Sequence, residues 1–282
     1  TDYYTDEAIK VIEKNKNRPF FLYLSHFAPH NPLQALRDDY DHFHHIEGES
    51  SEELKVYSAM LKALDRSVGR ILDTLEKNNL TDNTLIVLTS DNGGANYIHL
   101  SDINKPYRGW KLTHFEGGLH VPFMAKWPNK IEPGIEFNAP IHANDILPTF
   151  AAAAGAELPD DRIIDGVNLL PFLQNHNSDM PHETLYWLQG RLQTVLHENW
   201  KLITDHRTGK DWLFNVESDP YERINLASEM TLKVEELKRL LNDHKKVQPP
   251  PLYDNTMSAP ILIDKHNGYA FQDGDEFTYW DN

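Results

Sequence analysis

The chain has no cysteine, few basic residues and no long apolar run. Without cysteine among its 282 residues, it can form no disulfide, zinc-thiolate site or thiol nucleophile of its own. Lysine and arginine number 27 against 43 aspartates and glutamates, a net charge of −16, which argues against a nucleic-acid partner. No apolar run approaches the roughly 20 residues of a membrane-spanning helix. We therefore expect neither nucleic acid nor membrane as a partner.

The first part of the chain alternates helical and strand-like patterns. Helical patterns cover residues 5–16, a long stretch that ends at Asn78, and residues 146–154. Apolar runs of strand length occupy residues 20–24, 85–89 and 121–127. Since helices alternate with strands, the pattern predicts parallel strands joined by crossover helices. We expect the run at 85–89 to be buried on both faces of the sheet.

The pattern changes near residue 179. Short strand-like runs at 185–188, 192–197, 200–204 and 212–216 are separated by turn residues, as in an antiparallel meander. A helix follows, with Val234, Leu237 and Leu241 on one face, and residues 248–282 are expected to form an extended tail. The predicted fold class is α/β, with a mostly parallel or mixed sheet flanked by helices plus a small C-terminal antiparallel sheet. The predicted domains are residues 1–178 and 179–282.

Two loops that follow predicted strands carry polar side chains suited to chemistry. Asp91 and Asn92, followed by two glycines, come directly after the run at 85–89. In α/β folds, ligands bind at the C-terminal edge of the sheet, and carboxylate and amide oxygens suit hard cations. An ordinary turn after a strand would use the same residues. His30 lies in a proline-rich loop after residues 20–24.

Seven segments together resemble one protein family. They are RPFFLYL at 18–24, APHNP at 28–32, LDRSVG at 64–69, TSDNG at 89–93, RGWKLTHFEGG at 108–118, WP at 127–128 and LFNVESDPYERINL at 213–226. Their order resembles that of the sulfatase family in the alkaline phosphatase superfamily, from about residue 5 to residue 241. The resemblance implies an N-terminally truncated alkaline-phosphatase-like fold.

The resemblance also implies an activity and a site. Members hydrolyse sulfate monoesters with a formylglycine nucleophile beside a calcium ion that oxygen ligands hold. By this likeness Asp91 and Asn92 bind Ca²⁺, while His30 and Lys111 contact the sulfate and act in catalysis. Further residues that could line the substrate pocket are Arg108, Trp110 and His99. His26, His114 and His120 are expected to form the wall of the site or to lie behind it.

The nucleophile motif of the family, Cys or Ser followed by x-Pro-x-Arg, does not occur in the sequence. We therefore expect the formylglycine, and the rest of the metal site, to lie in an N-terminal part of the same protein outside these residues. That part would be a partner of this chain, and the chain alone is expected to be inactive. The family likeness favours a periplasmic or secreted location.

Two alternatives stay open at this point. The chain could be a non-enzymatic fragment or binding module in which His30, Asp91 and Lys111 are present but unused. It could also belong to a phosphoesterase of the same superfamily, which would change the ester while keeping a metal and an anion pocket. The expected substrate is a sulfated small molecule or saccharide, and the acidic surface favours oligosaccharides or small esters over a highly charged polymer.

Overall fold

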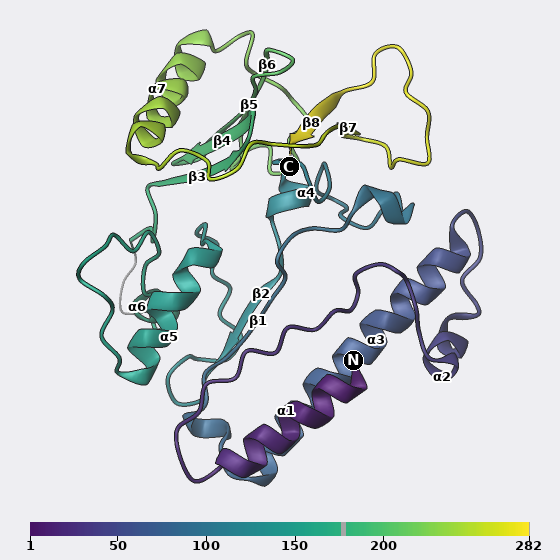
Figure 1. The fold of residues 1–282 in the computed structure, drawn as a ribbon, viewed down its shortest axis with the longest axis vertical. Coiled ribbons are helices and arrows are strands. Elements are labelled where there is room, and N and C mark those ends of the chain that lie inside the picture. Colours follow the sequence, from purple (N-terminus) through teal and green to yellow (C-terminus); the bar gives the residue numbers. More distant parts are fainter. Residues whose placement is uncertain (176–178, 282) are drawn as a thin grey trace. The chain divides into compact units, whose positions relative to one another are not determined.

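The computed structural model describes residues 1–175 and 179–281. They form two compact units, which we describe separately (Figure 1). Unit 1 comprises Thr1–Val87, Ile98–Leu100 and Ala125–Pro133, and unit 2 comprises Leu88–Tyr97, Ser101–Met124 and Gly134–Asn282. The bounds of these units differ from those of the predicted domains, 1–178 and 179–282. The division into those two domains stays a prediction. Residues 176–178 and 282, which belong to it, lie outside the described residues.

Unit 1 is built on helix packing. Its helices are α1 (Asp2–Asn15), α2 (Arg37–Tyr40) and α3 (Ser51–Lys77), with 3₁₀ turns at Asp41–Phe43 and Thr81–Asn83. Helix α1 packs along α3 and buries Ala8 and Ile12 (Figure 1). The long helix ends at Lys77, as its pattern predicts. Helix α1 begins three residues before the predicted start, because Thr5 is buried inside the helix instead of capping it.

The predicted strand at residues 20–24 does not form, and the predicted burial of the strand at 85–89 is not found. Residues 20–24 form no strand, and Tyr23 is 79% exposed. A strand requires a ladder partner, and among the described residues no strand pairs with this segment. Strands β1 (Ile86–Thr89) and β2 (Phe123–Lys126) do form, and they make a two-stranded sheet. Burial of β1 on both faces is not found, since Leu88 is exposed.

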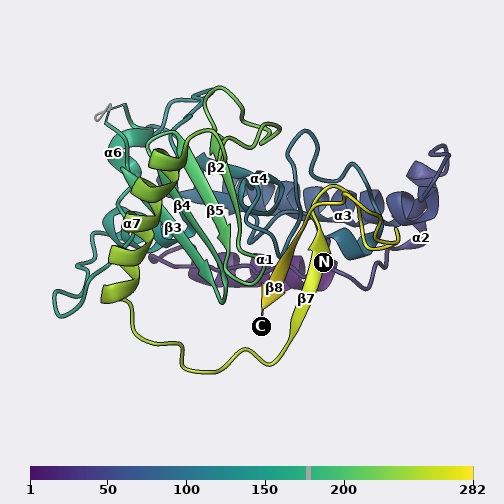
Figure 2. The same ribbon diagram turned by 90° about the horizontal axis from the view of Figure 1, so that it is seen from above.

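Unit 2 centres on the predicted meander, which is confirmed. Strands β3 (Thr184–Gln189), β4 (Leu192–His197), β5 (Trp200–Asp205) and β6 (Lys210–Asn215) pair in sequence order, all antiparallel. Helix α7 (Thr231–Val247) lies across one face of this sheet (Figure 2) and packs Leu237 and Leu241 against Leu202. The other face buries Ile203 with Phe115. The sheet is therefore covered on both sides.

Shorter elements complete the described chain. They are α4 (Glu116–Leu119), α5 (Ile146–Ala154), α6 (Leu170–Leu173) and 3₁₀ turns at Asn96–Ile98 and Ala143–Asp145. Gly155 ends α5 in a left-handed conformation, φ 65°, as predicted for a helix C-terminus. None of the helices in the described ranges combines the length and hydropathy needed to cross a bilayer.

The tail holds more structure than the extended arm that the sequence predicts. Strands β7 (Ser258–Leu262) and β8 (Phe277–Asp281) form an antiparallel pair. The backbone N–H of Tyr279 donates to Asp205 Oδ2 at 3.1 Å, which connects this pair to β5. The predicted fold class, α/β with a small C-terminal antiparallel sheet and helix, is confirmed.

Candidate active site

The residues of the predicted site are divided between the two units. His30 and His99 belong to unit 1, while Asp91, Asn92, Arg108, Trp110 and Lys111 belong to unit 2. Strand β1 ends at Thr89, so Asp91 and Asn92 do follow a strand end as predicted. The assignment of roles to these residues stays a prediction.

In unit 2, backbone hydrogen bonds join the loop of Asp91 to the loop of Lys111. The Lys111 N–H donates to Gly94 O at 2.9 Å, and the Gly93 N–H donates to Gly118 O at 3.0 Å. The side chain of Asn104 holds the same loops together. Its Oδ1 accepts the Gly94 N–H at 2.7 Å, and its Nδ2 donates to Gly94 O at 2.9 Å and to Gly109 O at 3.0 Å. The sequence offered no signal for this role of Asn104.

The donor set at Asp91 and Asn92 fits a calcium ion in chemistry. The carboxylate of Asp91 is exposed and accepts no hydrogen bond within the described part of the chain. Asn92 donates from Nδ2 to Gly93 O at 3.2 Å, which leaves its amide oxygen for other contacts. Calcium takes six to eight oxygens, and residues 1–175 and 179–281 contain no group of three or more His, Cys, Asp or Glu side chains that could hold a metal ion. Asp91 and Asn92 can therefore supply only part of such a site.

Arg108 and Trp110 are both turned into the protein. Arg108 binds the carboxylate of Asp264 through two hydrogen bonds, at 2.7 and 2.6 Å, and also pairs with Glu276. Trp110 is 4% exposed, and its indole Nε1 is buried with no hydrogen-bond partner in the described chain. Arg108 therefore holds the C-terminal tail to this loop, whereas the prediction that Arg108 and Trp110 line a substrate pocket stays untested.

A group of charged side chains surrounds the buried Lys201, and one of them, Glu116, is the first residue of α4. Lys201 Nζ donates to Glu116 Oε1 at 2.6 Å and pairs with Glu222 Oε1 at 2.8 Å. His120 Nδ1 lies 2.8 Å from Glu116 Oε2 and its ring stacks on Tyr107. Burial would raise the pKa of Glu116, but the Lys201 ammonium and His120 bring it down to about 2. Burial raises the pKa of Glu222, and Lys201 opposes this shift.

His114 was expected to form the wall of the site or to lie behind it, and that placement stays a prediction. His114 is buried, and its Nδ1 is hydrogen-bonded to Thr194 Oγ1 at 2.9 Å. Burial, with the nearby charge of Lys201, lowers its pKa to about 3. His114 is therefore neutral in the folded protein at neutral pH.

The buried His114 predicts a loss of stability in mild acid. Below the ordinary histidine pKa of about 6.5, the unfolded chain binds a proton that the folded chain cannot bind until about pH 3. The free energy of unfolding should therefore fall as the pH falls through this range, by about 1.4 kcal/mol per pH unit from this group. Urea unfolding at several pH values measures the slope. His114→Gln should make this slope shallower. Thr194→Val, which keeps the imidazole, should not. Equal slopes for His114→Gln and the wild type would contradict the prediction.

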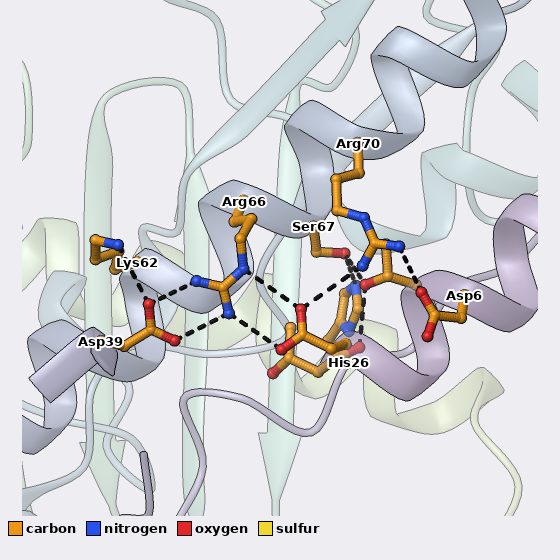
Figure 3. A network of polar contacts seen from close by, with 10 residues as sticks. Asp6, His26, Asp39, Lys62, Arg66, Ser67 and Arg70 are labelled. Atoms are coloured by element: carbon orange, nitrogen blue, oxygen red, sulfur yellow. Dashed lines mark hydrogen bonds and ion pairs between the residues drawn. The ribbon is translucent and has the colours of Figure 1, made fainter. Parts of the chain in front are cut away.

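In unit 1, a polar network supports the segment that carries His30 (Figure 3). Ser67 on α3 is fully buried; its Oγ accepts from Thr5 Oγ1 at 2.6 Å and is hydrogen-bonded to His26 Nε2 at 2.9 Å. His30, four residues after His26, is exposed, and its Nδ1 is hydrogen-bonded to Asn31 O at 2.7 Å. With the proton on Nδ1, the neutral ring presents Nε2 as its basic nitrogen.

The same network joins the three helices of unit 1 (Figure 3). Arg66 on α3 donates from Nη2 to Asp39 at 2.9 Å and to Asp2 at 3.1 Å, so one guanidinium links α3 to α2 and α1. Lys62 adds a second cation to the buried Asp39 at 3.2 Å. His99, the other predicted residue of this unit, is exposed and adopts φ 60°.

The likeness of the motifs to known proteins extends across the chain. A family model described as Sulfatase matches residues 1–156, more than half of the chain. The chain belongs to the sulfatase family. A second model, described as N-sulphoglucosamine sulphohydrolase, C-terminal, matches residues 109–247 of this sulfatase chain.

Curated relatives and solved structures agree with this membership. Steryl-sulfatase of Rattus norvegicus is 34% identical over 227 residues, 78% of this chain and 37% of the relative. The uncharacterized sulfatase YdeN of Escherichia coli (strain K12) is 37% identical over 202 residues, 71% of this chain and 35% of the relative. The crystal structure of Ps i-CgsB in complex with k-i-k-neocarrahexaose is 33% identical, with a TM-score of 0.79, over 89% of this chain and 56% of the other. The chain thus spans about a third of the length of these curated relatives.

Proposed function

We propose that this chain forms part of a calcium-assisted sulfuric ester hydrolase of the arylsulfatase type. The observation that carries the proposal is the backbone frame of unit 2, in which the Lys111 N–H donates to Gly94 O and so joins the backbone of Lys111 to the loop that carries Asp91 and Asn92. An ammonium group and a cation-binding pair on adjoining loops suit an anionic substrate.

Each residue has a role in this proposal. Asp91 and Asn92 would hold Ca²⁺, which when bound supplies positive charge opposite the sulfate group. Lys111 binds the sulfate oxygens as a cationic donor. His30 contacts the sulfate and can hold a proton at Nε2.

The nucleophile in this proposal comes from outside the 282 residues. The chain contains no Cys- or Ser-x-Pro-x-Arg motif, and we propose that an N-terminal part of the same protein, as its partner, supplies the formylglycine and the remaining calcium ligands. We further propose a periplasmic or secreted location and a sulfated small molecule or saccharide as substrate. The relatives include a steryl-sulfatase and a protein crystallised in complex with k-i-k-neocarrahexaose, which supports both substrate types.

Two forms of the protein, expressed from the same gene, test the proposal. The first is the 282-residue chain alone, which should not hydrolyse 4-nitrophenyl sulfate. The second is the chain with whatever sequence its reading frame supplies before Thr1, where we expect a Cys- or Ser-x-Pro-x-Arg motif and calcium-dependent sulfate release. Turnover by the 282-residue chain would overturn its predicted inactivity. Faster hydrolysis of 4-nitrophenyl phosphate than of the sulfate would favour a phosphoesterase.

Within the longer protein, Asp91→Ala is expected to weaken calcium binding at least about tenfold, because a metal site that loses a carboxylate ligand keeps fewer charges against the cation. Initial rates measured against calcium concentration give the effect. Asp102→Ala is the matched control, since Asp102 is an exposed carboxylate paired with Lys105; it should leave the calcium dependence unchanged. If Asp91→Ala leaves the calcium dependence unchanged, Asp91 does not bind the metal.

A further inference from the structure

A fully buried lysine, Lys201, connects the sheet of β3 to β6 to the proposed site. Lys201 lies on β5, opposite Leu196 of β4 and Phe214 of β6, and its side chain is 1% exposed. A buried ammonium group is strongly unfavourable unless it is paired and hydrogen-bonded. Its partners, Glu116 at 2.6 Å and Glu222 at 2.8 Å, meet that requirement. The lysine is thus held at a defined place with two carboxylates around it.

Glu222 fixes the start of α4 as well as the lysine. Its Oε2 accepts the backbone N–H of Glu116 at 2.7 Å, while its Oε1 faces Lys201. Glu222 adopts φ 56°, a left-handed conformation that residues other than glycine seldom take. Arg108 Nη1 donates to Glu222 O at 3.3 Å. Glu116 is therefore held twice, through its side chain by Lys201 and through its backbone by Glu222.

Helix α4 in turn contacts the loop of the proposed metal ligands. The Gly117 N–H donates to Arg108 O at 2.7 Å, and Gly118 O accepts the N–H of Gly93 at 3.0 Å. Gly93 directly follows Asn92. A shift of Glu116 would move the acceptor that holds Gly93, and with it the Asp91–Asn92 pair.

We propose that Lys201 is a positioning residue of this site. By holding Glu116, it fixes α4, and α4 fixes the loop of Asp91 and Asn92. Lys201 acts through Glu116, and Glu222 completes the arrangement by anchoring the first backbone N–H of α4. The catalytic meaning of this role rests on the proposed function, whereas the mechanical coupling can be tested without substrate or calcium.

Hydrogen exchange of the complete chain tests the coupling. In Lys201→Met, the backbone amides of residues 91–94 and 116–119 should exchange at least about tenfold faster, while those of β4 and β5 change less. Lys238→Met is the matched control: it removes a lysine that pairs with Asp211 on the same sheet but is 40% exposed, and it should leave residues 91–94 unchanged. A uniform rise across unit 2, or no rise at residues 91–94, would show that Lys201 only stabilises the fold and would overturn the proposal.

A second variant covers the case in which Lys201→Met does not fold. Glu222→Gln keeps the Lys201–Glu116 pair but replaces the charged acceptor of the Glu116 N–H. It should accelerate exchange at residues 116–119 and 91–94 by a smaller factor, again without a matching change in β4 and β5. If exchange in these two segments stays as in the wild type, the proposal is wrong. Because neither measurement uses catalysis, failure here is distinct from failure of the proposed activity.

Discussion

Alanine in place of Phe115 is expected to lower the free energy of unfolding by about 3–5 kcal/mol. Phe115 is fully buried between the site loops and the C-terminal sheet. Its ring meets Trp212 edge-on, with centroids 5.6 Å apart, and lies 6.0 Å from Phe214. Removing the ring leaves a cavity lined by aromatic groups that cannot collapse around one methyl. Urea unfolding followed by far-UV circular dichroism gives the change.

Phe271→Ala is the control for this experiment. The same side chain is removed, but Phe271 is 51% exposed, and the free energy of unfolding should change by no more than about 0.5 kcal/mol. Tryptophan fluorescence adds a local readout, because Trp212 is fully buried against Phe115. If Phe115→Ala lowers the free energy of unfolding by less than about 1 kcal/mol, the side chains around Phe115 repack freely, and the description of this core is incorrect.

The meander β3 to β6 could be predicted because its information is local. Each strand is a short run that ends at turn residues, and Gly190 and Gly209 adopt the left-handed conformations, φ 56° and 72°, that such turns require. The run at 20–24 has an equally strand-like composition, yet it forms no strand. Whether a segment joins a ladder depends on a partner elsewhere in the chain, and composition carries no information about that partner.

Lys201 shows why part of the site could not be predicted. Along β5, Leu202 faces α7, and Lys201 shares the opposite face with Ile203. A lysine in an alternating strand normally indicates a solvent-exposed face. Here the Phe115 segment covers that face, so the lysine is buried with Glu116. The place of Asp91 and Asn92 after a strand was predictable because it depends only on where β1 ends, while their role as metal ligands stays a prediction.

Alanine in place of Gly93 is expected to lower kcat/KM of the longer protein about a hundredfold, the effect typical of a misplacement of about 1 Å in an active site. A Cβ added at Gly93 would lie 1.8 Å from Gly117 O. Gly117 O is a backbone atom, and the new Cβ is bonded directly to the Cα of Gly93, so no side-chain rotation can separate the two. We expect relief to come from the Gly93 N–H leaving Gly118 O, which would displace Asp91 and Asn92, the residues that directly precede Gly93. Sulfate release and calcium titration both measure the result.

Gly69→Ala provides the matched control, because a Cβ at Gly69 on α3 meets nothing within 4 Å. Glycine inside a helix is less favourable than alanine by about 1 kcal/mol, so this variant should be slightly more stable and equally active. The two variants make the same chemical change and differ only in what the new methyl group meets. Normal kcat/KM in Gly93→Ala would show that the contact between Gly93 and α4 does not set the catalytic geometry. Reduced kcat/KM with an unchanged melting temperature would show that this contact positions the proposed metal ligands rather than stabilising the fold.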